Sequence, residues 1–110
     1  MALRIEKAAH FVADYELRFG WYVDQGGADL AFRFQRTLDE TLLRLASRPD
    51  LGVLRHFRHP TLRGLRSFQV NSPFNAVLIF YRVEADILHA VRLMHGARDL
   101  PRRLRQSSDV

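Results

Sequence analysis

The run Ala76-Val77-Leu78-Ile79-Phe80-Tyr81-Arg82-Val83 constrains the fold more than any other stretch, because it is apolar at nearly every position. A run of this length that is rich in β-branched and aromatic residues is typical of a central strand covered on both faces. The short acidic turn at residues 83–86 leads into residues 87–95, which are mostly apolar and are expected to pair with the first run as a hairpin. Other segments of the chain must therefore pack on both faces of the sheet.

Two further segments extend this sheet. Residues 65–70 precede the turn sequence Asn71-Ser72-Pro73-Phe74-Asn75 and are predicted to form a third antiparallel strand. Residues 3–5 alternate in polarity and are compatible with a short first strand. The expected sheet is thus antiparallel and has three to four strands.

The first half of the chain has a helical period instead of a strand period. Gln25-Gly26-Gly27 is predicted to end a first helix, because glycine readily adopts the conformation that follows a last helical turn. A second helix is predicted to stop at residues 48–52, where Pro49 disfavours helix in the residue before it. The apolar stripes of the two helices consist of Ala8, Phe11, Tyr15, Phe19 and Tyr22, and of Ala31, Phe34, Leu38, Leu42 and Leu45. Few residues join them, so we expect an antiparallel helical hairpin.

Together these segments predict one α+β domain spanning residues 1–110. Its parts are a helical hairpin at about 8–47, a basic loop at about 53–64, the sheet at about 65–95 and a C-terminal tail at 96–110. No apolar stretch is long enough to span a membrane, and the absence of cysteine fits a reducing cytoplasm. Cytoplasmic localisation is the expectation.

The charge is divided unevenly along the chain. Residues 1–50 have a net charge of −1, whereas residues 51–110 carry ten arginines against four acids, a net charge of +6. No acid occurs between Asp50 and Glu84. A positive surface made of arginine suits phosphate, nucleoprotein or an acidic protein partner. The candidate residues for binding a target or partner are Arg55, Arg58, Arg63, Arg66, Arg82 and Arg98.

Four of the basic residues lie near predicted strand ends and raise the question of catalysis. Arg66, Arg82, His95 and Arg98 would meet at one edge of the sheet if the strand ends coincide. Such a group can hold a phosphodiester and move a proton, which is the minimum for metal-free RNA cleavage. The simpler interpretation, favoured by spacing alone, is that nearby acids pair with these arginines structurally. No catalytic residue is therefore firm, and no cofactor or metal is expected. His56 and His59 have arginine neighbours where a zinc site needs further ligands.

The ordered motifs of the chain resemble the RelE/ParE toxin superfamily of bacterial toxin–antitoxin systems, and especially its ParE-like branch, often labelled plasmid stabilisation protein. The resembling residues are Asp14 with Trp21-Tyr22, Arg48-Pro49-x-Leu51-Gly52, Gly64-Leu65-Arg66-Ser67, Ile79-Phe80-Tyr81-Arg82-Val83 and His95-Gly96-Ala97-Arg98-Asp99. The resemblance implies two helices packed on a curved antiparallel sheet. It also implies a small acidic antitoxin, encoded alongside, that wraps and silences the toxin.

Two activities compete within that superfamily. The ParE-like branch inhibits DNA gyrase without being an enzyme, and the strand and ending motifs resemble that branch more closely. The RelE-like branch cleaves messenger RNA on the ribosome; in this chain it would use Arg66, His95 and Arg98. The tyrosine that the RelE-like pattern implies near the C-terminus is replaced by Leu104. We therefore expect a gyrase inhibitor neutralised by a cognate antitoxin, with the ribosome-dependent endoribonuclease as the alternative. A toxin that has lost its target interface is a third reading.

Overall fold

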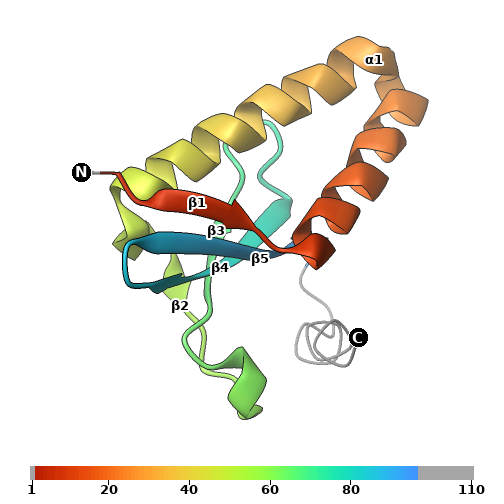
Figure 1. Cartoon of the computed structure of the whole chain (residues 1–110). Helices are drawn as coiled ribbons and strands as arrows, with labels where there is room; N and C mark the ends of the chain where they lie inside the picture. Colours follow the sequence, from red (N-terminus) through yellow and green to blue (C-terminus); the bar gives the residue numbers. More distant parts are fainter. Residues whose placement is uncertain (1, 97–110) are drawn as a thin grey trace.

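The computed structural model describes residues 2–96, which fold into one long bent helix and a sheet (Figure 1). The predicted tail beyond Gly96, including Arg98, lies outside the described residues. The elements in chain order are β1 (Arg4–Lys7), α1 (Ala9–Ser47), the 3-10 turn η1 (Pro49–Leu51), β2 (Val53–Leu54), the 3-10 turn η2 (Pro60–Leu62), β3 (Arg66–Gln69), β4 (Val77–Glu84) and β5 (Ile87–His95).

The helix α1 is a hairpin whose two arms meet at Gly27. This residue has φ 83° and ψ 179°, a conformation that is essentially restricted to glycine, and it interrupts the helix between residues 9–26 and 28–47. Figure 1 shows the two arms descending from the bend toward the sheet. The prediction of a helical hairpin broken at the glycine pair is confirmed, although one residue makes the turn instead of a loop. In the described part of the chain, no helix is long and apolar enough to cross a membrane.

The sheet has five strands among the described residues, in the order β1-β5-β4-β3-β2. The three predicted main strands are confirmed to within one residue at each end. The expectation of three to four strands, all antiparallel, was wrong in two respects. The first strand is present, but β1 pairs with β5 in parallel, from Arg4 opposite Ile87 to Lys7 opposite Ala90. The sheet is therefore mixed, while the α+β class holds.

The second difference lies in the segment that we expected to be a basic loop. Its first residues form β2, in which Val53 pairs with Ser67 and Leu54 with Arg66. The amide of Arg55 continues this ladder by donating to the carbonyl of Leu65 over 2.8 Å. The pairing satisfies outward-facing backbone groups at the start of β3, which would otherwise lack partners. The sequence signal was missed because a two-residue strand has no detectable period.

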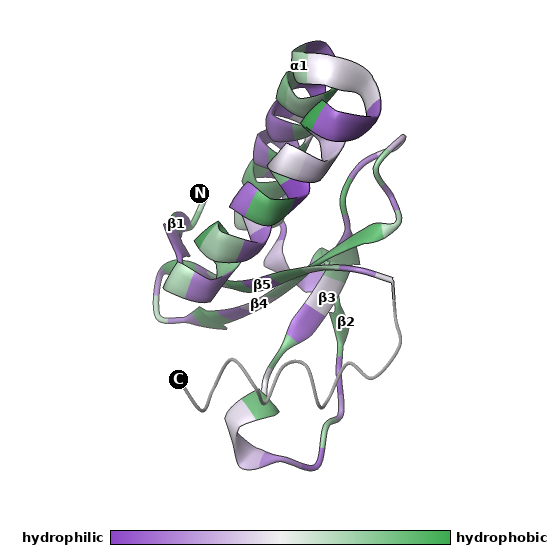
Figure 2. Cartoon of the chain, turned by 90° about the vertical axis from the view of Figure 1, so that its right-hand side faces the viewer, coloured by the Kyte–Doolittle hydropathy of each residue, from purple (hydrophilic) through white to green (hydrophobic). Residues whose placement is uncertain are grey.

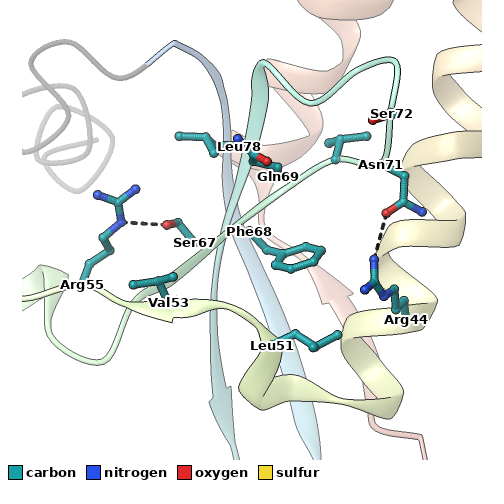
Figure 3. Close-up of a pocket in the computed structure, with 11 residues that line it drawn as sticks. Arg44, Leu51, Val53, Arg55, Ser67, Phe68, Gln69, Asn71, Ser72 and Leu78 are labelled. Atoms are coloured by element: carbon teal, nitrogen blue, oxygen red, sulfur yellow. Dashed lines mark hydrogen bonds between the residues drawn. The ribbon is translucent and has the colours of Figure 1, made fainter.

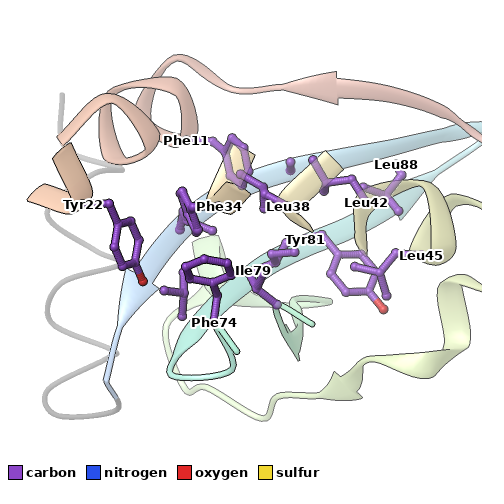
Figure 4. Packing of buried hydrophobic residues seen from close by; sticks show 14 of the residues in the cluster. Phe11, Tyr22, Phe34, Leu38, Leu42, Leu45, Phe74, Ile79, Tyr81 and Leu88 are labelled. Carbon is purple, nitrogen blue, oxygen red and sulfur yellow. The ribbon is translucent and has the colours of Figure 1, made fainter. Parts of the chain in front are cut away.

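The main core lies between the helical hairpin and the sheet (Figure 4). Both predicted helical stripes contribute to it, and so do Val77, Ile79 and Tyr81, which alternate along β4. Rings from both arms and from the turn before β4 pack together, with Phe34 within 5.3 Å of Phe74 between centroids. The largest fully buried side chains on this side are Phe11, Phe34, Leu38, Leu42, Leu45, Val70, Ile79, Tyr81 and Leu88.

The opposite face of β4 is covered by a smaller apolar cluster. It consists of Leu62, Leu65, Phe80 and Met94, with Phe57, Leu78 and Val91 packed around it. The segment between β2 and β3 thus covers this face of the sheet. In Figure 2 the largely apolar colouring of β4 and β5 runs between the helical layer and this segment. The prediction that residues 76–83 form a strand covered on both faces is confirmed.

Candidate functional site

The motif Arg48-Pro49-x-Leu51-Gly52 forms a turn held by a tyrosine of the central strand. The hydroxyl of Tyr81 donates to the carbonyl of Pro49 over 2.6 Å and accepts from the amide of Gly52 over 2.9 Å. A Cβ atom at Gly52 would overlap the Tyr81 ring and hydroxyl, so a side chain there would displace the strand or the turn. Burial raises the pKa of Tyr81, while the Gly52 amide and Arg66 act against this rise.

Arg66 belongs to the same turn. Its Nη1 donates to the carbonyl of Gly52 over 2.8 Å. Because Arg66 pairs directly with Tyr81 in the sheet, the two side chains share the face that carries α1. This contact gives Arg66 a structural role at the end of the helical hairpin.

Arg82 and Arg55 lie on the opposite face of the sheet. Arg82 follows Tyr81 and therefore points away from α1, where its Nη2 donates to the carbonyl of Thr61 over 2.8 Å. Arg55 donates from Nε to the hydroxyl of Ser67 over 2.7 Å. Arg66 and Arg82 are thus neighbours in register, as expected from the strand ends, but they face opposite sides of the sheet.

The remaining basic candidates are spread more widely. Arg58 and Arg63 are exposed on the segment between β2 and β3, where they bracket η2. Among the described residues, no group of three histidine, aspartate or glutamate side chains is placed to hold a metal ion. The described arginines therefore form a dispersed positive surface, not a single cluster.

His95 does not join Arg66. It pairs with Val77 at the start of β4, whereas Arg66 pairs with Tyr81, four residues further along the same strand. This separation is roughly 14 Å along the strand and about 10 Å across two strand spacings. His95 instead borders a groove of about 310 Å³ with Trp21 and Arg18 of the first helical arm. The expectation that strand ends bring Arg66, Arg82 and His95 to one edge was wrong for His95. β3 and β5 both run antiparallel to β4, so the start of β3 and the end of β5 lie at opposite ends of the sheet.

An ion pair that sequence reasoning missed closes the edge of β5. Asp14 accepts from Nε and Nη2 of Arg92, over 2.6 and 2.9 Å, and from the amide of Leu93 over 3.0 Å. β1 stops pairing at Ala90, so the Leu93 amide has lost its neighbouring strand and Asp14 takes the place of one. The resemblance singled out Asp14, but only the length difference between β1 and β5 reveals what it does.

A groove of about 510 Å³ lies near the opposite edge of the sheet, beside β3 (Figure 3). Its two ends are marked by Arg44 and Arg55, with Leu51, Val53 and Phe68 between them. The Arg44 guanidinium stands 5.3 Å from the Phe68 ring centroid and donates to the Asn71 side chain over 3.3 Å. The lining of this groove contains arginine and amide side chains but no acidic one.

The sequence profile of the family described as "ParE toxin of type II toxin-antitoxin system, parDE" matches residues 5–100. The chain belongs to the ParE toxin family. The match spans both helical arms, the turn held by Tyr81 and all of the sheet except its first residue. It accounts for the toxin character that the ordered motifs predicted.

Two solved structures share the fold of this ParE-family chain. The chromosomal ParDE toxin–antitoxin system from P. aeruginosa superposes with a TM-score of 0.70 at 17% identity, covering 87% of this chain and 98% of that one. A double arginine-to-alanine mutant of E. coli toxin RelE in the free state superposes with a TM-score of 0.58 at 10% identity, covering 99% and 96%. No curated protein matches the sequence significantly. These likenesses confirm the RelE/ParE-like α+β fold.

Proposed function

We propose that this chain is the toxin of a type II toxin–antitoxin pair, that it inhibits DNA gyrase by binding, and that a cognate antitoxin neutralises it. The observation that carries the proposal is the match to the ParE toxin family over residues 5–100. Gyrase is the target implied by the resemblance of the strand and ending motifs to the ParE-like branch. A binding inhibitor needs an interaction surface and no reaction centre.

The placement of the basic residues supports binding over nuclease chemistry. Phosphodiester cleavage needs the proton-transfer group within hydrogen-bond reach of the reacting oxygen, beside the cations that stabilise the developing charge. Arg66 donates to the Gly52 carbonyl, and His95 sits at the far end of β4 beside Trp21. The described part of the nuclease set is thus divided between two ends of the sheet.

The charge distribution supports an acidic or nucleoprotein partner. Arg58 and Arg63 are exposed, and no acid lies between Asp50 and Glu84 to neutralise them locally. Such a surface raises the rate of encounter with an anionic partner and makes binding sensitive to salt. Both gyrase engaged with DNA and an acidic antitoxin present such an anionic surface.

Purified protein free of antitoxin should be assayed in parallel for gyrase supercoiling and for ribosome-programmed messenger RNA cleavage. The expected result is loss of supercoiling with accumulation of cleaved DNA and intact message. His95→Gln should leave the inhibition unchanged, because His95 is exposed and would have no chemical step to perform. Arg58→Ala and Arg63→Ala should weaken inhibition, whereas Arg33→Ala, an exposed arginine on α1, serves as the matched control.

Cut message with unaffected gyrase, abolished by His95→Gln, would overturn the proposal in favour of the RelE-like endoribonuclease. Inactivity in both assays, with antitoxin binding retained, would instead show a toxin that has lost its target interface. Neutralisation is tested separately by co-expression with the protein encoded alongside, which should form a stable complex and restore supercoiling.

A further inference from the structure

The sheet edge beside β3 is interrupted at one residue. The amide of Val70 donates to the carbonyl of Val77 over 2.9 Å. In an antiparallel ladder the bonding direction alternates, so the backbone groups of Arg66, Phe68 and Val70 bond to β4. Those of Ser67 and Gln69 point away from β4, toward the edge of the sheet. Ser67 pairs outward with Val53 of β2. Gln69 has no such strand partner, because β2 begins at Val53 and the preceding Leu51 belongs to η1.

The next backbone amide that points toward this edge, that of Asn71, already has a hydrogen-bond partner. The amide of Asn71 donates to the hydroxyl of Thr41 over 3.1 Å, so α1 closes the edge there. Within residues 2–96 the amide and carbonyl of Gln69 have no outward hydrogen-bond partner. An unpaired amide and carbonyl on an exposed strand edge form a template for one more stretch of extended backbone.

This opening lies in the groove of about 510 Å³ described above. Arg55 lies at one end of the groove, held by Ser67, and Arg44 at the other, held by Asn71 (Figure 3). Leu51, Val53 and Phe68 supply apolar surface between them. A cation at each end, apolar surface in the middle and a free backbone pair together specify the ligand.

We propose that this groove binds an extended, acidic peptide segment that adds a short strand at Gln69. The proposal deepens the proposed function, since it rests on the antitoxin as the natural source of that segment. The segment residue opposite Gln69 would exchange both backbone hydrogen bonds with it, and its side chain would share the face that carries Arg55. Adjacent segment residues would project to the face of Phe68 and Arg44. Acidic side chains at neighbouring positions therefore meet a different arginine each.

The width of the opening limits what the groove contributes. Val53 on one side and Thr41 on the other leave room for one backbone-paired residue, which gives two hydrogen bonds. The interaction is accordingly one contact among several in a longer partner, and its strength falls as salt rises. The opening excludes proline at the paired position of the segment, because proline has no amide to donate.

The probe is an acetylated and amidated peptide with two adjacent glutamates flanked by valines, so that one glutamate faces each arginine, and it is titrated against the isotope-labelled full chain by NMR. Saturable binding should slow hydrogen exchange at the Gln69 amide and should be at least tenfold tighter than binding of the matching lysine–valine peptide. Arg44→Ala and Arg55→Ala should each weaken binding about tenfold, with Arg33→Ala as the matched control. Gln69→Pro removes the outward amide without removing a bond to β4, and it should weaken binding to the same extent.

A peptide N-methylated at its central amide tests the same hydrogen bonds without altering the protein, and it should bind at least tenfold more weakly. Absence of saturable binding at millimolar peptide would overturn the proposal. So would equal binding of the lysine peptide, or binding of a single-stranded oligonucleotide to the same arginines with Gln69 still exchanging freely.

Failure of this proposal is separable from failure of the proposed function. In the complex with the co-expressed antitoxin, protection of the Gln69 amide is expected. If the antitoxin neutralises the toxin while that amide stays unprotected, the groove assignment is wrong and the toxin function stands. If gyrase is not inhibited, the peptide titration still reports on the groove.

Discussion

The amide of Gly52 donates a 2.9 Å hydrogen bond to the phenolic oxygen of Tyr81. Twenty-nine residues separate the two in sequence, and the contact ties the turn after the helical hairpin to the central strand of the sheet. Arg66 closes the same turn from β3 through the Gly52 carbonyl. One buried hydroxyl and one arginine thus fix how α1 is seated on the sheet.

Replacing Tyr81 by phenylalanine tests this arrangement. The change removes a donor and an acceptor and leaves the Pro49 carbonyl and the Gly52 amide without their partner, which should lower the free energy of unfolding by about 1–3 kcal/mol. Urea denaturation measures the loss. Tyr22→Phe is the matched control, because its hydroxyl has no hydrogen bond to any residue between 2 and 96 although its ring is packed against Phe34. An equal effect of both changes would contradict the assignment.

The same hydroxyl should make stability depend on alkaline pH. Burial raises the pKa of Tyr81 above its ordinary value of 10.0, so the folded state holds this proton more tightly than the unfolded state. The stabilisation that the protonated Tyr81 hydroxyl gives to the fold is fully present below pH 10, and it is lost as the pH rises through the raised pKa. Melting temperatures measured from pH 8.5 to 11 should fall more steeply for the native protein than for Tyr81→Phe. Parallel curves would show that other groups dominate, since the pKa values of Tyr15 and Tyr22 are also raised by burial.

Asp14→Asn should destabilise the edge of β5. The carboxylate and the Arg92 guanidinium are only 14% and 16% exposed, so the amide would replace two charge-assisted hydrogen bonds by weaker ones to a neutral side chain at a largely buried place. We expect a loss of about 2–3 kcal/mol and faster hydrogen exchange at the Leu93 amide. The control Glu16→Gln removes an exposed acid of the same helical arm and should change stability by less than about 0.5 kcal/mol.

Two glycine-to-alanine changes in α1 should have opposite signs. Gly20 is helical and exposed with open space around its Cα, so alanine there should stabilise the fold by up to about 1 kcal/mol. Gly27 has φ 83°, and alanine there should destabilise the hairpin by about 1–3 kcal/mol despite the open space. Thermal unfolding of both variants measures the difference. Stabilisation by Gly27→Ala would mean that the two arms tolerate a continuous helix.

The parts of the fold that follow from local period were predictable. The apolar stripe of α1 and the unbroken apolar run of β4 can be recognised in the sequence because each pattern extends over many residues. Gly27 was visible as the break because a glycine pair interrupts an otherwise continuous helical pattern. The conformation of such residues is determined by the sequence immediately around them.

The parts that depend on pairing between distant segments were not predictable. No local signal shows that β1 runs parallel to β5, or that two residues after η1 form β2. The order of the strands is also invisible in sequence. Because β3 and β5 flank β4 and both run antiparallel to it, Arg66 lies near Tyr81 while His95 lies near Val77. A one-residue difference places Arg66 and Arg82 on opposite faces of the sheet. The basic candidates among the described residues therefore do not form a single cluster, and their role in binding stays a prediction.

The parallel pairing of Arg4 with Ile87 also orders the events of synthesis. Among the described strands, β1 pairs only with β5, so it stays unpaired until Ile87–His95 has been synthesised. Until β5 arrives, β1 has no strand to join and β4 lacks one of its two neighbours. A prematurely terminated chain would present unpaired, partly apolar strand edges and would be prone to aggregate. In this ParE-family toxin, the chain must therefore be translated through His95 before the complete sheet can form.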